Sequence, residues 1–549
     1  MIPICVLVFS VLITTTLIPL FSKLALRYNA VDMPDSRKVH ILPTPRVGGL
    51  AMAIGVFTPM LVLNTSSTSV RAFLAGAAVI ILFGIIDDLV SLPPLTKMAG
   101  QVTAALIVIF LGDCNIHSLG MLMPAGMTLA APISIPLTLI TIVGVTNAIN
   151  LADGLDGLAG GISLLIFGCL GFLAYEVNDQ ETGLVALAFI GAIFGFLRYN
   201  TFPASIFMGD TGSQLLGFAA ITFSLTLTQG ESHLSPLLPL VLLGFPVLDT
   251  LSVMTTRIIN RRSPFSPDKN HLHHNLLALG LRHPESVLLL YIVQTLMVMA
   301  AYRYRHGSEW LLLGGYILFS VVLLAAMSRA QRAGWQVGRP SLMDKLIEDP
   351  FRRLRRQGIT MEYALPGFLV LVVALLVSAG LIPALIPQPA GLVAFALAGL
   401  IMAGALIRKS PSVELIRLAL YIIIPLAVYL GENRSISWMT DSLKQGYDAL
   451  FYCTALLTVI ISRLSRRVDG FRSTPLDFLI ILTVIVVPYV FSVDNGDRMM
   501  ALVSAKIIIL YFSLEVLLAE LRGKYTAVCY ATLLQLFIIG GRGSEWILF

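Results

Sequence analysis

Apolar runs separated by short polar segments make up almost the whole chain. A run of about 17–25 apolar residues is long enough to cross a bilayer as a helix. Eleven such helices are predicted before residue 330, near 3–22, 48–63, 72–86, 98–112, 132–147, 158–175, 184–198, 213–229, 235–256, 286–303 and 309–327. About seven more are predicted near 364–383, 389–407, 413–430, 447–462, 475–493, 499–520 and 525–540. The pattern therefore predicts an all-α polytopic integral membrane protein with about 18 transmembrane helices.

The composition excludes a soluble globular protein. Of the 549 residues, 57% are hydrophobic and only 12% are charged, whereas a soluble domain carries about 25% charged residues. A basic polar stretch at 331–363 is expected to form a cytoplasmic linker. It would separate a membrane core at 1–330 from an additional transmembrane region of unknown role at 364–549.

The basic residues predict how the helices are oriented. No Lys or Arg precedes the first apolar run, and Lys23 follows it. Because positive charge stays on the cytoplasmic side, the N-terminus should lie outside and the first helix should be retained. With that parity the inner loops are basic, the outer loops are short or acidic, and every conspicuous polar cluster falls on the cytoplasmic face.

Two acidic motifs lie at predicted helix ends. Asp87 and Asp88 end an apolar helix, where the helix dipole is already negative, so a metal ion or Lys97 should compensate them. Asp210 in "MGDTGS" precedes another helix and is a candidate Mg²⁺ ligand, with the hydroxyl side chains after it as candidate caps. A solvated acidic pair and a simple helix cap are the alternatives.

The segment "NAINLADGLDGLAGG" combines amides, carboxylates and glycines. Asn147, Asn150, Asp153 and Asp156 recur at every third position. On a helix the first three would share an arc of about 120°. Such a set suits a nucleotide base, a ribose or a cation, and the glycines allow close approach. A glycine-rich helix-packing seam is the alternative, but it explains only the glycines.

Two basic motifs suit an anion. "DSRKVHILPTPRVGG" brings Lys38 and Arg46 before a helix that starts with two glycines. "PDKNHLHH" holds Lys269 and the histidines His271, His273 and His274. The basic surroundings favour a phosphate over a zinc ion, although zinc and an ordinary basic loop stay open. Together, the five motifs predict Mg²⁺-dependent chemistry on a phosphorylated substrate at the cytoplasmic membrane surface.

This ordered motif set resembles the polyprenyl-phosphate N-acetylhexosamine-1-phosphate transferases of the MraY/WecA type, over residues 1–330. The resemblance implies an eleven-helix core in the bacterial cytoplasmic membrane. It also implies transfer of a sugar-1-phosphate from a UDP-sugar to undecaprenyl phosphate, with release of UMP and with Mg²⁺ or Mn²⁺ as cofactor. This reaction would be the first membrane step of a cell-surface polysaccharide.

The resemblance also implies roles for single residues. The expected catalytic residues are Asp87, Asp88, Asp153, His271, His273 and His274. Asp210 and Asp153 are the expected metal ligands. The expected substrate-binding residues are Lys38, Arg46, Lys97, Asn147, Asn150, Asp156 and Lys269.

The donor sugar and the partners are less constrained. Leu272 interrupts the histidine run, which resembles the branch that uses UDP-GlcNAc. Another UDP-HexNAc and UDP-MurNAc-pentapeptide remain alternatives, and a polytopic transporter is the non-enzyme alternative. A homodimer and polysaccharide-assembly proteins bound through 364–549 remain open as partners, and no nucleic acid is expected.

Overall fold

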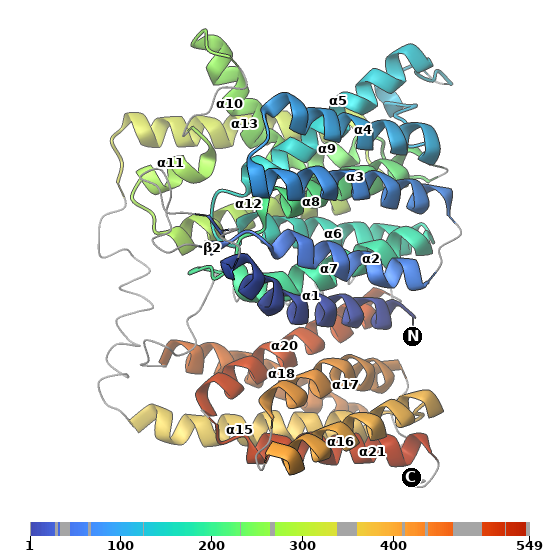
Figure 1. The fold of residues 1–549 in the computed structure, drawn as a ribbon, viewed down its shortest axis with the longest axis vertical. Helices are drawn as coiled ribbons and strands as arrows, with labels where there is room; N and C mark the ends of the chain where they lie inside the picture. Colours follow the sequence, from blue (N-terminus) through green and yellow to red (C-terminus); the bar gives the residue numbers. More distant parts are fainter. Residues whose placement is uncertain are drawn as a thin grey trace. The chain divides into compact units, whose positions relative to one another are not determined.

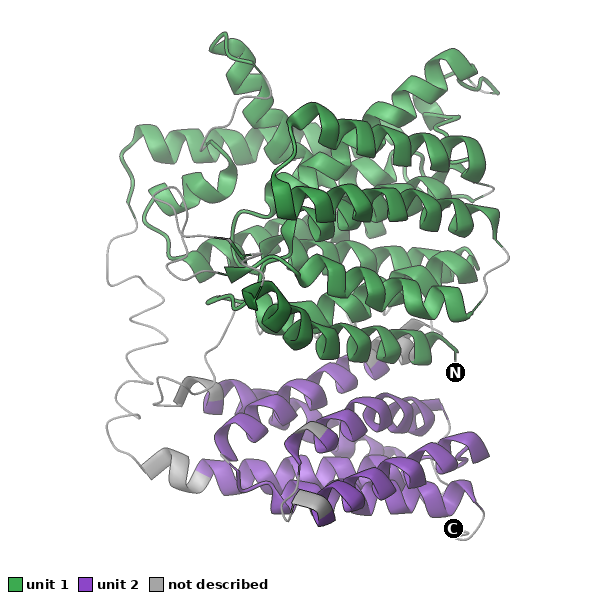
Figure 2. Cartoon of the chain, in the orientation of Figure 1, with its two compact units in different colours: residues 1–337 green, residues 338–549 purple. Residues whose placement is uncertain are grey.

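The computed structural model describes residues 2–27, 31–32, 44–63, 67–124, 126–230, 232–263, 270–336, 359–408, 412–433, 438–464, 497–521 and 523–544. These residues are almost entirely helical, and β1 (Val31–Asp32) pairs with β2 (Thr44–Pro45) in one short antiparallel ladder (Figure 1). The chain forms two compact units, residues 1–337 and 338–549 (Figure 2).

The first unit contains the elements that carry the predicted motifs. Its helices are α1 (Ile2–Arg27), α2 (Gly48–Val62), α3 (Thr68–Val90), α4 (Pro94–Gly112), the 3₁₀ turn η1 (Gly120–Leu122), α5 (Ala131–Ala152), α6 (Leu158–Glu176), α7 (Gln180–Asn200), α8 (Gly209–Gln229), α9 (Leu238–Leu242), α10 (Gly244–Ile259), α11 (Leu272–Ala278), α12 (His283–Arg303) and α13 (Glu309–Arg332).

The second unit is also helical. Its described helices are α15 (Ile359–Leu381), α16 (Gln388–Arg408), α17 (Val413–Asn433), α18 (Asp441–Leu464), α20 (Asp497–Leu521) and α21 (Thr526–Gly543). Most of the expected linker 331–363 and the helix expected near 475–493 lie outside the described residues.

Twelve of the described helices are long and apolar enough to cross a membrane. The predicted all-α polytopic membrane fold is therefore confirmed, while the total of about 18 helices stays a prediction. Three more described helices, α8, α18 and α20, also exceed twenty residues in length but are not among these twelve.

Helix α8 runs through the middle of the first unit and contacts α2, α3, α5, α6 and α9. Every residue from Thr211 to Leu225 is buried. Neighbouring helices approach closely at its glycines, since a Cβ on Gly212 would lie 2.7 Å from Gly49 Cα of α2. Because α8 is surrounded by protein, it needs no continuous apolar surface toward lipid, which explains its lower hydropathy.

The single helix expected at 235–256 is wrong, because the chain breaks there into α9 and α10. Pro246 lacks the N–H that would bond the carbonyl of Leu242 in a continuous helix. The Gln294 side chain donates to that carbonyl instead, at 2.8 Å. The Tyr316 hydroxyl donates to the Gly244 carbonyl at 3.1 Å, so the break is stabilised by side chains from α12 and α13.

Candidate active site

One lysine joins two of the predicted carboxylates. Lys97 Nζ, in the first turn of α4, lies 2.5 Å from Asp87 Oδ2 at the end of α3. The same ammonium lies 2.7 Å from Asp210 Oδ2 in the first turn of α8. The prediction that Lys97 could compensate the acidic pair is thus met for Asp87. Three helix ends converge at this one point.

Asp88 makes different contacts, because its carboxylate lies at the N-terminus of α8. Oδ1 accepts a hydrogen bond from Asp210 N (2.8 Å), while Oδ2 accepts from Thr211 N (3.2 Å) and from the Thr211 hydroxyl (2.7 Å). An acidic group here also complements the positive end of the helix dipole. Asp88 therefore orients the first turn that carries Asp210.

The expectation that hydroxyl side chains after Asp210 would cap α8 is wrong. The Thr211 hydroxyl bonds to Asp88, and the Ser213 hydroxyl donates to Asn150 Oδ1 (2.5 Å) and to the Gly209 carbonyl (3.0 Å). Gly209 has φ +70°, and a Cβ there would lie 2.6 Å from Asp88 Oδ2. The glycine is required because the capping carboxylate comes from another helix.

The amide side chains of α5 face two buried glutamines. Asn147 Nδ2 donates to Gln101 Oε1 at 2.7 Å, and Gln101 Nε2 donates to Gln214 Oε1 at 3.0 Å. This network connects α4, α5 and α8 directly behind the carboxylates. Asn147 therefore contributes to holding the helices together, and Asn150 is the amide nearer to the α8 N-terminus through Ser213.

The helix predicted to carry Asn147, Asn150 and Asp153 on one face ends before Asp153. Helix α5 stops at Ala152, and Asp153 is its C-terminal cap with φ −78° and ψ +50°. Asp153 and Asp156 therefore lie in a turn between α5 and α6. Gly157, at φ +81°, ends this turn in a conformation that favours glycine.

Backbone contacts fix the 153–157 turn. The Gly157 N–H donates to Asn200 Oδ1 at 2.9 Å, and the Tyr291 hydroxyl donates to the Gly157 carbonyl at 2.6 Å. Asp156 Oδ2 accepts from Ala204 N at 2.9 Å, and the Asp156 N–H donates to His283 Nε2 at 3.1 Å. One carboxylate oxygen of Asp156 therefore accepts a hydrogen bond from the protein backbone.

The acidic surroundings change the titration of Asp153. Burial raises the pKa of Asp153 to about 7, and the negative charge of Asp210 acts in the same direction. The charge of Arg46 opposes this rise. Arg46 follows β2, where the Phe207 N–H donates to the Pro45 carbonyl at 2.8 Å, so the first basic motif is attached to the segment before Asp210.

The histidine motif is held by an acidic residue that the sequence analysis missed. Asp249 of α10 is buried, and its Oδ2 lies 2.8 Å from His271 Nδ1. Its Oδ1 accepts from Leu272 N at 2.7 Å, at the start of α11. Asp249 therefore fixes both the ring of His271 and the backbone from which His273 and His274 extend.

His273 reaches the turn that contains Asp153. A Cβ on Gly154 would lie 2.3 Å from His273 Nε2, so only glycine allows this ring to approach. The rings of His273 and His274 lie 4.2 Å apart between centroids. Burial lowers the pKa of His273 to about 3, and the neighbouring His274 acts in the same direction. His273 is therefore neutral at neutral pH.

The structure brings most of the predicted residues together. The contacts above connect Asp87, Asp88, Lys97, Asn147, Asn150, Asp153, Asp156, Asp210, His271, His273 and His274 through neighbouring elements. Lys38 and Lys269 lie outside the described residues. Gln101, Gln214, Asn200 and Asp249 were missed, because isolated polar residues within apolar helices give no spacing signal.

The oxygen donors fit a divalent cation. Asp87 and Asp210 already converge on one positive charge, the Lys97 ammonium. Carboxylate oxygens are the ligands that Mg²⁺ prefers, usually with substrate phosphates completing its shell. Within the described ranges, no three His, Cys, Asp or Glu side chains form a ready metal site.

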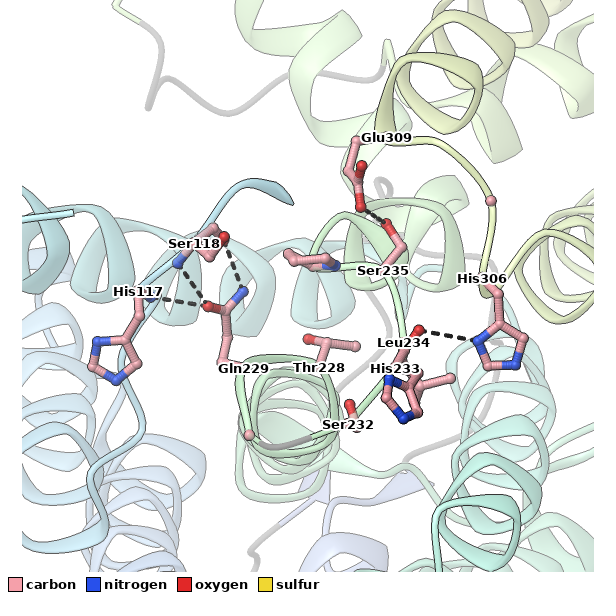
Figure 3. Close-up of a pocket in the computed structure, with 13 residues that line it drawn as sticks. His117, Ser118, Thr228, Gln229, Ser232, His233, Leu234, Ser235, His306 and Glu309 are labelled. Carbon is pink, nitrogen blue, oxygen red and sulfur yellow. Dashed lines mark hydrogen bonds between the residues drawn. The ribbon is translucent and has the colours of Figure 1, made fainter. Parts of the chain in front are cut away.

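A polar cavity of about 310 Å³ lies at the other end of α8, around Gln229. Gln229 is 19 residues after Asp210, which corresponds to about 28 Å along a helix. Figure 3 shows Gln229 bonded to the 117–118 backbone and Ser235 bonded to Glu309. None of the predicted site residues lines this cavity, so it is separate from the carboxylate site.

Comparison with known proteins gives a family. The pattern that defines glycosyl transferase family 4 matches residues 70–228, which include Asp87, Asp153 and Asp210. A Bacillus subtilis (strain 168) protein described as a probable undecaprenyl-phosphate N-acetylglucosaminyl 1-phosphate transferase is 36% identical over 323 residues, covering 58% of this chain and 89% of that protein.

Two further relatives agree. The decaprenyl-phosphate N-acetylglucosaminephosphotransferase of Mycolicibacterium smegmatis is 36% identical over 336 residues, covering 55% of this chain and 82% of its own. The undecaprenyl-phosphate alpha-N-acetylglucosaminyl 1-phosphate transferase of Yersinia pestis is 30% identical over 342 residues. These residues cover 61% of this chain and 91% of that protein. The chain therefore belongs to glycosyl transferase family 4, as the ordered motifs predicted.

Proposed function

We propose that this protein transfers N-acetylglucosamine-1-phosphate from UDP-GlcNAc to undecaprenyl phosphate and releases UMP. The observation that carries the proposal is the convergence of Asp87 and Asp210 on Lys97, beside the Asp153 turn. The names of the relatives support the donor and the polyprenyl acceptor. The reaction would begin a cell-surface polysaccharide on the cytoplasmic face of the membrane.

The site can support a direct displacement. An oxygen of the lipid phosphate attacks the β-phosphorus of UDP-GlcNAc, the bond to the α-phosphate oxygen breaks, and UMP leaves. A phosphate monoester has a second pKa of about 6, so the nucleophile is mostly ionised at neutral pH. The reaction therefore does not depend on a strong general base.

Each carboxylate then has a separate role. Asp210 and Asp153 would hold Mg²⁺ or Mn²⁺, and a bound divalent cation neutralises negative charge on the diphosphate. Asp88 positions Asp210 through the three bonds at the α8 N-terminus. Asp87 holds the Lys97 ammonium close to the site, where it offsets charge that develops on the phosphates.

The basic and amide side chains would bind the substrates. Arg46 and Lys97 would offer positive charge to the phosphates, and Asn150 and Asp156 would contact the nucleoside, since both lie at or just after the end of α5. The histidines extend the site on the α11 side, with His271 oriented by Asp249. These groups meet at helix ends rather than midway along the helices, which disfavours the transporter alternative.

A mass-spectrometric assay tests the proposal. Purified protein is incubated with undecaprenyl phosphate, Mg²⁺ and UDP-GlcNAc, and UMP and the lipid-linked sugar are followed together. We expect equal amounts of both products, none of which form after EDTA is added, and restored formation when excess Mg²⁺ returns. Product from UDP-GalNAc or UDP-MurNAc-pentapeptide, but none from UDP-GlcNAc, would contradict the donor.

A further inference from the structure

The second unit contains a lysine that is buried between helices. Lys506 of α20 is only 4% exposed, and its ammonium bonds to Glu432 of α17 and to Asp448 of α18. The ring of Tyr447 lies 4.8 Å from the ammonium, and the ring of Phe451 lies 5.2 Å from it. Two carboxylates and two aromatic faces thus enclose one positive charge.

These charges lie among helices that suit a membrane. Helix α18 packs against α15, and α20 packs against both α15 and α17, which are candidate membrane spans. Ionisable groups inside membrane proteins are costly and usually mark a path for ions or protons. Asp448 is 29% exposed, and Lys444 lies 3.4 Å from Glu432, so the cluster reaches the surface of the unit on the α18 side.

A line of polar side chains continues from this cluster along one face of α20. Lys506, Ser513 and Glu520 follow one another at intervals of seven residues, and all three are buried. Seven residues turn a helix by about 700°, so these side chains share an arc of about 40° and span about 21 Å. That length is most of a hydrocarbon core of about 30 Å.

Helix α18 supplies the facing half of this line. Thr454 and Thr458 are fully buried, and the Thr458 hydroxyl lies 2.8 Å from the Ser513 hydroxyl. Hydroxyl groups both donate and accept hydrogen bonds, so they can pass a proton between titratable groups. We define the proton seam as Asp448, Lys506, Thr454, Thr458, Ser513 and Glu520.

A second ion pair on α20 lies off this seam. Glu515 is two positions from Ser513, about 200° around the helix, and lies 3.1 Å from Arg417. The Tyr421 hydroxyl also donates to Glu515. Glu515 therefore offers a matched control, because it is a paired glutamate on the same helix but faces another neighbour.

We propose that the second unit conducts protons along the proton seam, between Asp448 at one end and Glu520 at the other. A proton from water would convert the Asp448 carboxylate to a carboxylic acid. It would then move through the hydroxyl contact between Thr458 and Ser513 and through water that bridges the longer intervals of the seam, with one O–H bond broken as each next one forms, and leave from Glu520. A metal cation is disfavoured as the cargo, because the Lys506 ammonium already occupies the position between the carboxylates.

Proton flux into liposomes tests this inference without using the transferase reaction. The full chain is reconstituted in phosphatidylcholine–phosphatidylglycerol vesicles that contain pyranine, and valinomycin with a potassium gradient drives protons inward. We expect acidification at least fivefold faster than in protein-free vesicles. Glu520→Gln and Asp448→Asn should return the rate to the protein-free value, whereas Glu515→Gln should stay within twofold of wild type.

Two outcomes would overturn the proposal. One is a wild-type rate equal to that of protein-free vesicles. The other is an equal loss in Glu515→Gln and Glu520→Gln, which would mean that the buried charges only stabilise the fold. If Glu520→Gln does not give a monodisperse protein, Ser513→Ala replaces it, since it removes the hydroxyl without leaving a charge unpaired. An undiminished flux in folded Ser513→Ala would also contradict the seam.

Discussion

Lys97 Nζ lies 2.5 Å from Asp87 Oδ2 and 2.7 Å from Asp210 Oδ2, so one ammonium joins the ends of three helices. Two carboxylates that both contact one ammonium lie close enough to repel each other unless a cation lies between them. The lysine therefore stabilises the arrangement before substrate arrives. It also competes with a divalent cation for Asp210.

Lys97→Met tests this competition. Without the ammonium, we expect Mn²⁺ to bind about tenfold more tightly in the absence of substrate, which corresponds to about 1.4 kcal/mol. Transfer should nevertheless slow at least tenfold, because the phosphates lose a positive charge. Electron paramagnetic resonance measures the free Mn²⁺, and Lys23→Met, an exposed lysine of α1, is the control. Weaker Mn²⁺ binding in Lys97→Met would contradict the competition.

Asp88 should matter for stability as well as for activity. Asp88→Asn keeps the size of the side chain but replaces one acceptor oxygen at the α8 N-terminus by a donor. We expect the free energy of unfolding to fall by about 1–2 kcal/mol. Denaturant titration in detergent measures this change, with Asp113→Asn as an exposed control. Equal stability of Asp88→Asn and wild type would mean that the three bonds are not needed.

Asp249 is predicted to affect catalysis mainly by orienting His271, beside its hydrogen bond to the backbone of Leu272. Asp249→Asn should lower kcat at least tenfold and leave KM within twofold, because the ring loses its orientation but no contact with substrate is removed. If the two residues act as one unit, Asp249→Asn combined with His271→Gln should be no slower than the slower single variant. Additive losses in steady-state kinetics would assign the two residues separate roles.

The depressed pKa of His273 predicts a dependence of stability on pH. Because the folded-state pKa is about 3 and the unfolded value is about 6.5, the unfolded chain binds the proton more readily. Stability from this group is fully present above about pH 6.5 and declines as pH falls toward 3. His273→Gln should flatten the fall in melting temperature between pH 6.5 and 4. An unchanged slope would contradict a buried neutral His273.

The sequence predicted that motifs far apart in the chain lie close together, because successive membrane helices alternate in direction and this brings certain helix ends to one face. Asp87 ends one helix and Asp210 begins another, so alternating helix directions predict that both lie on the same face of the membrane. The loops between spans are short, which leaves few other arrangements. The sequence therefore predicted the helical fold and which residues converge, but not which atoms bond.

The remaining features depend on packing. Asp249 is a single carboxylate within an apolar helix, and nothing in its spacing connects it with His271. The end of α5 at Ala152 follows from the contacts that Asn200 and Tyr291 make with the next turn. The break before Pro246 was visible as a proline, but only the side chain of Gln294 explains how the freed carbonyl is satisfied.

The most direct test of the account compares transfer by Asp210→Asn with transfer by Asp113→Asn, at saturating Mg²⁺. Asp210→Asn removes the carboxylate charge that would hold the cation, and we expect GlcNAc-1-phosphate transfer to fall by at least about 100-fold. Asp113→Asn, on the exposed end of α4, should keep the wild-type rate. Wild-type turnover with unchanged metal dependence in Asp210→Asn would contradict the assignment of this site.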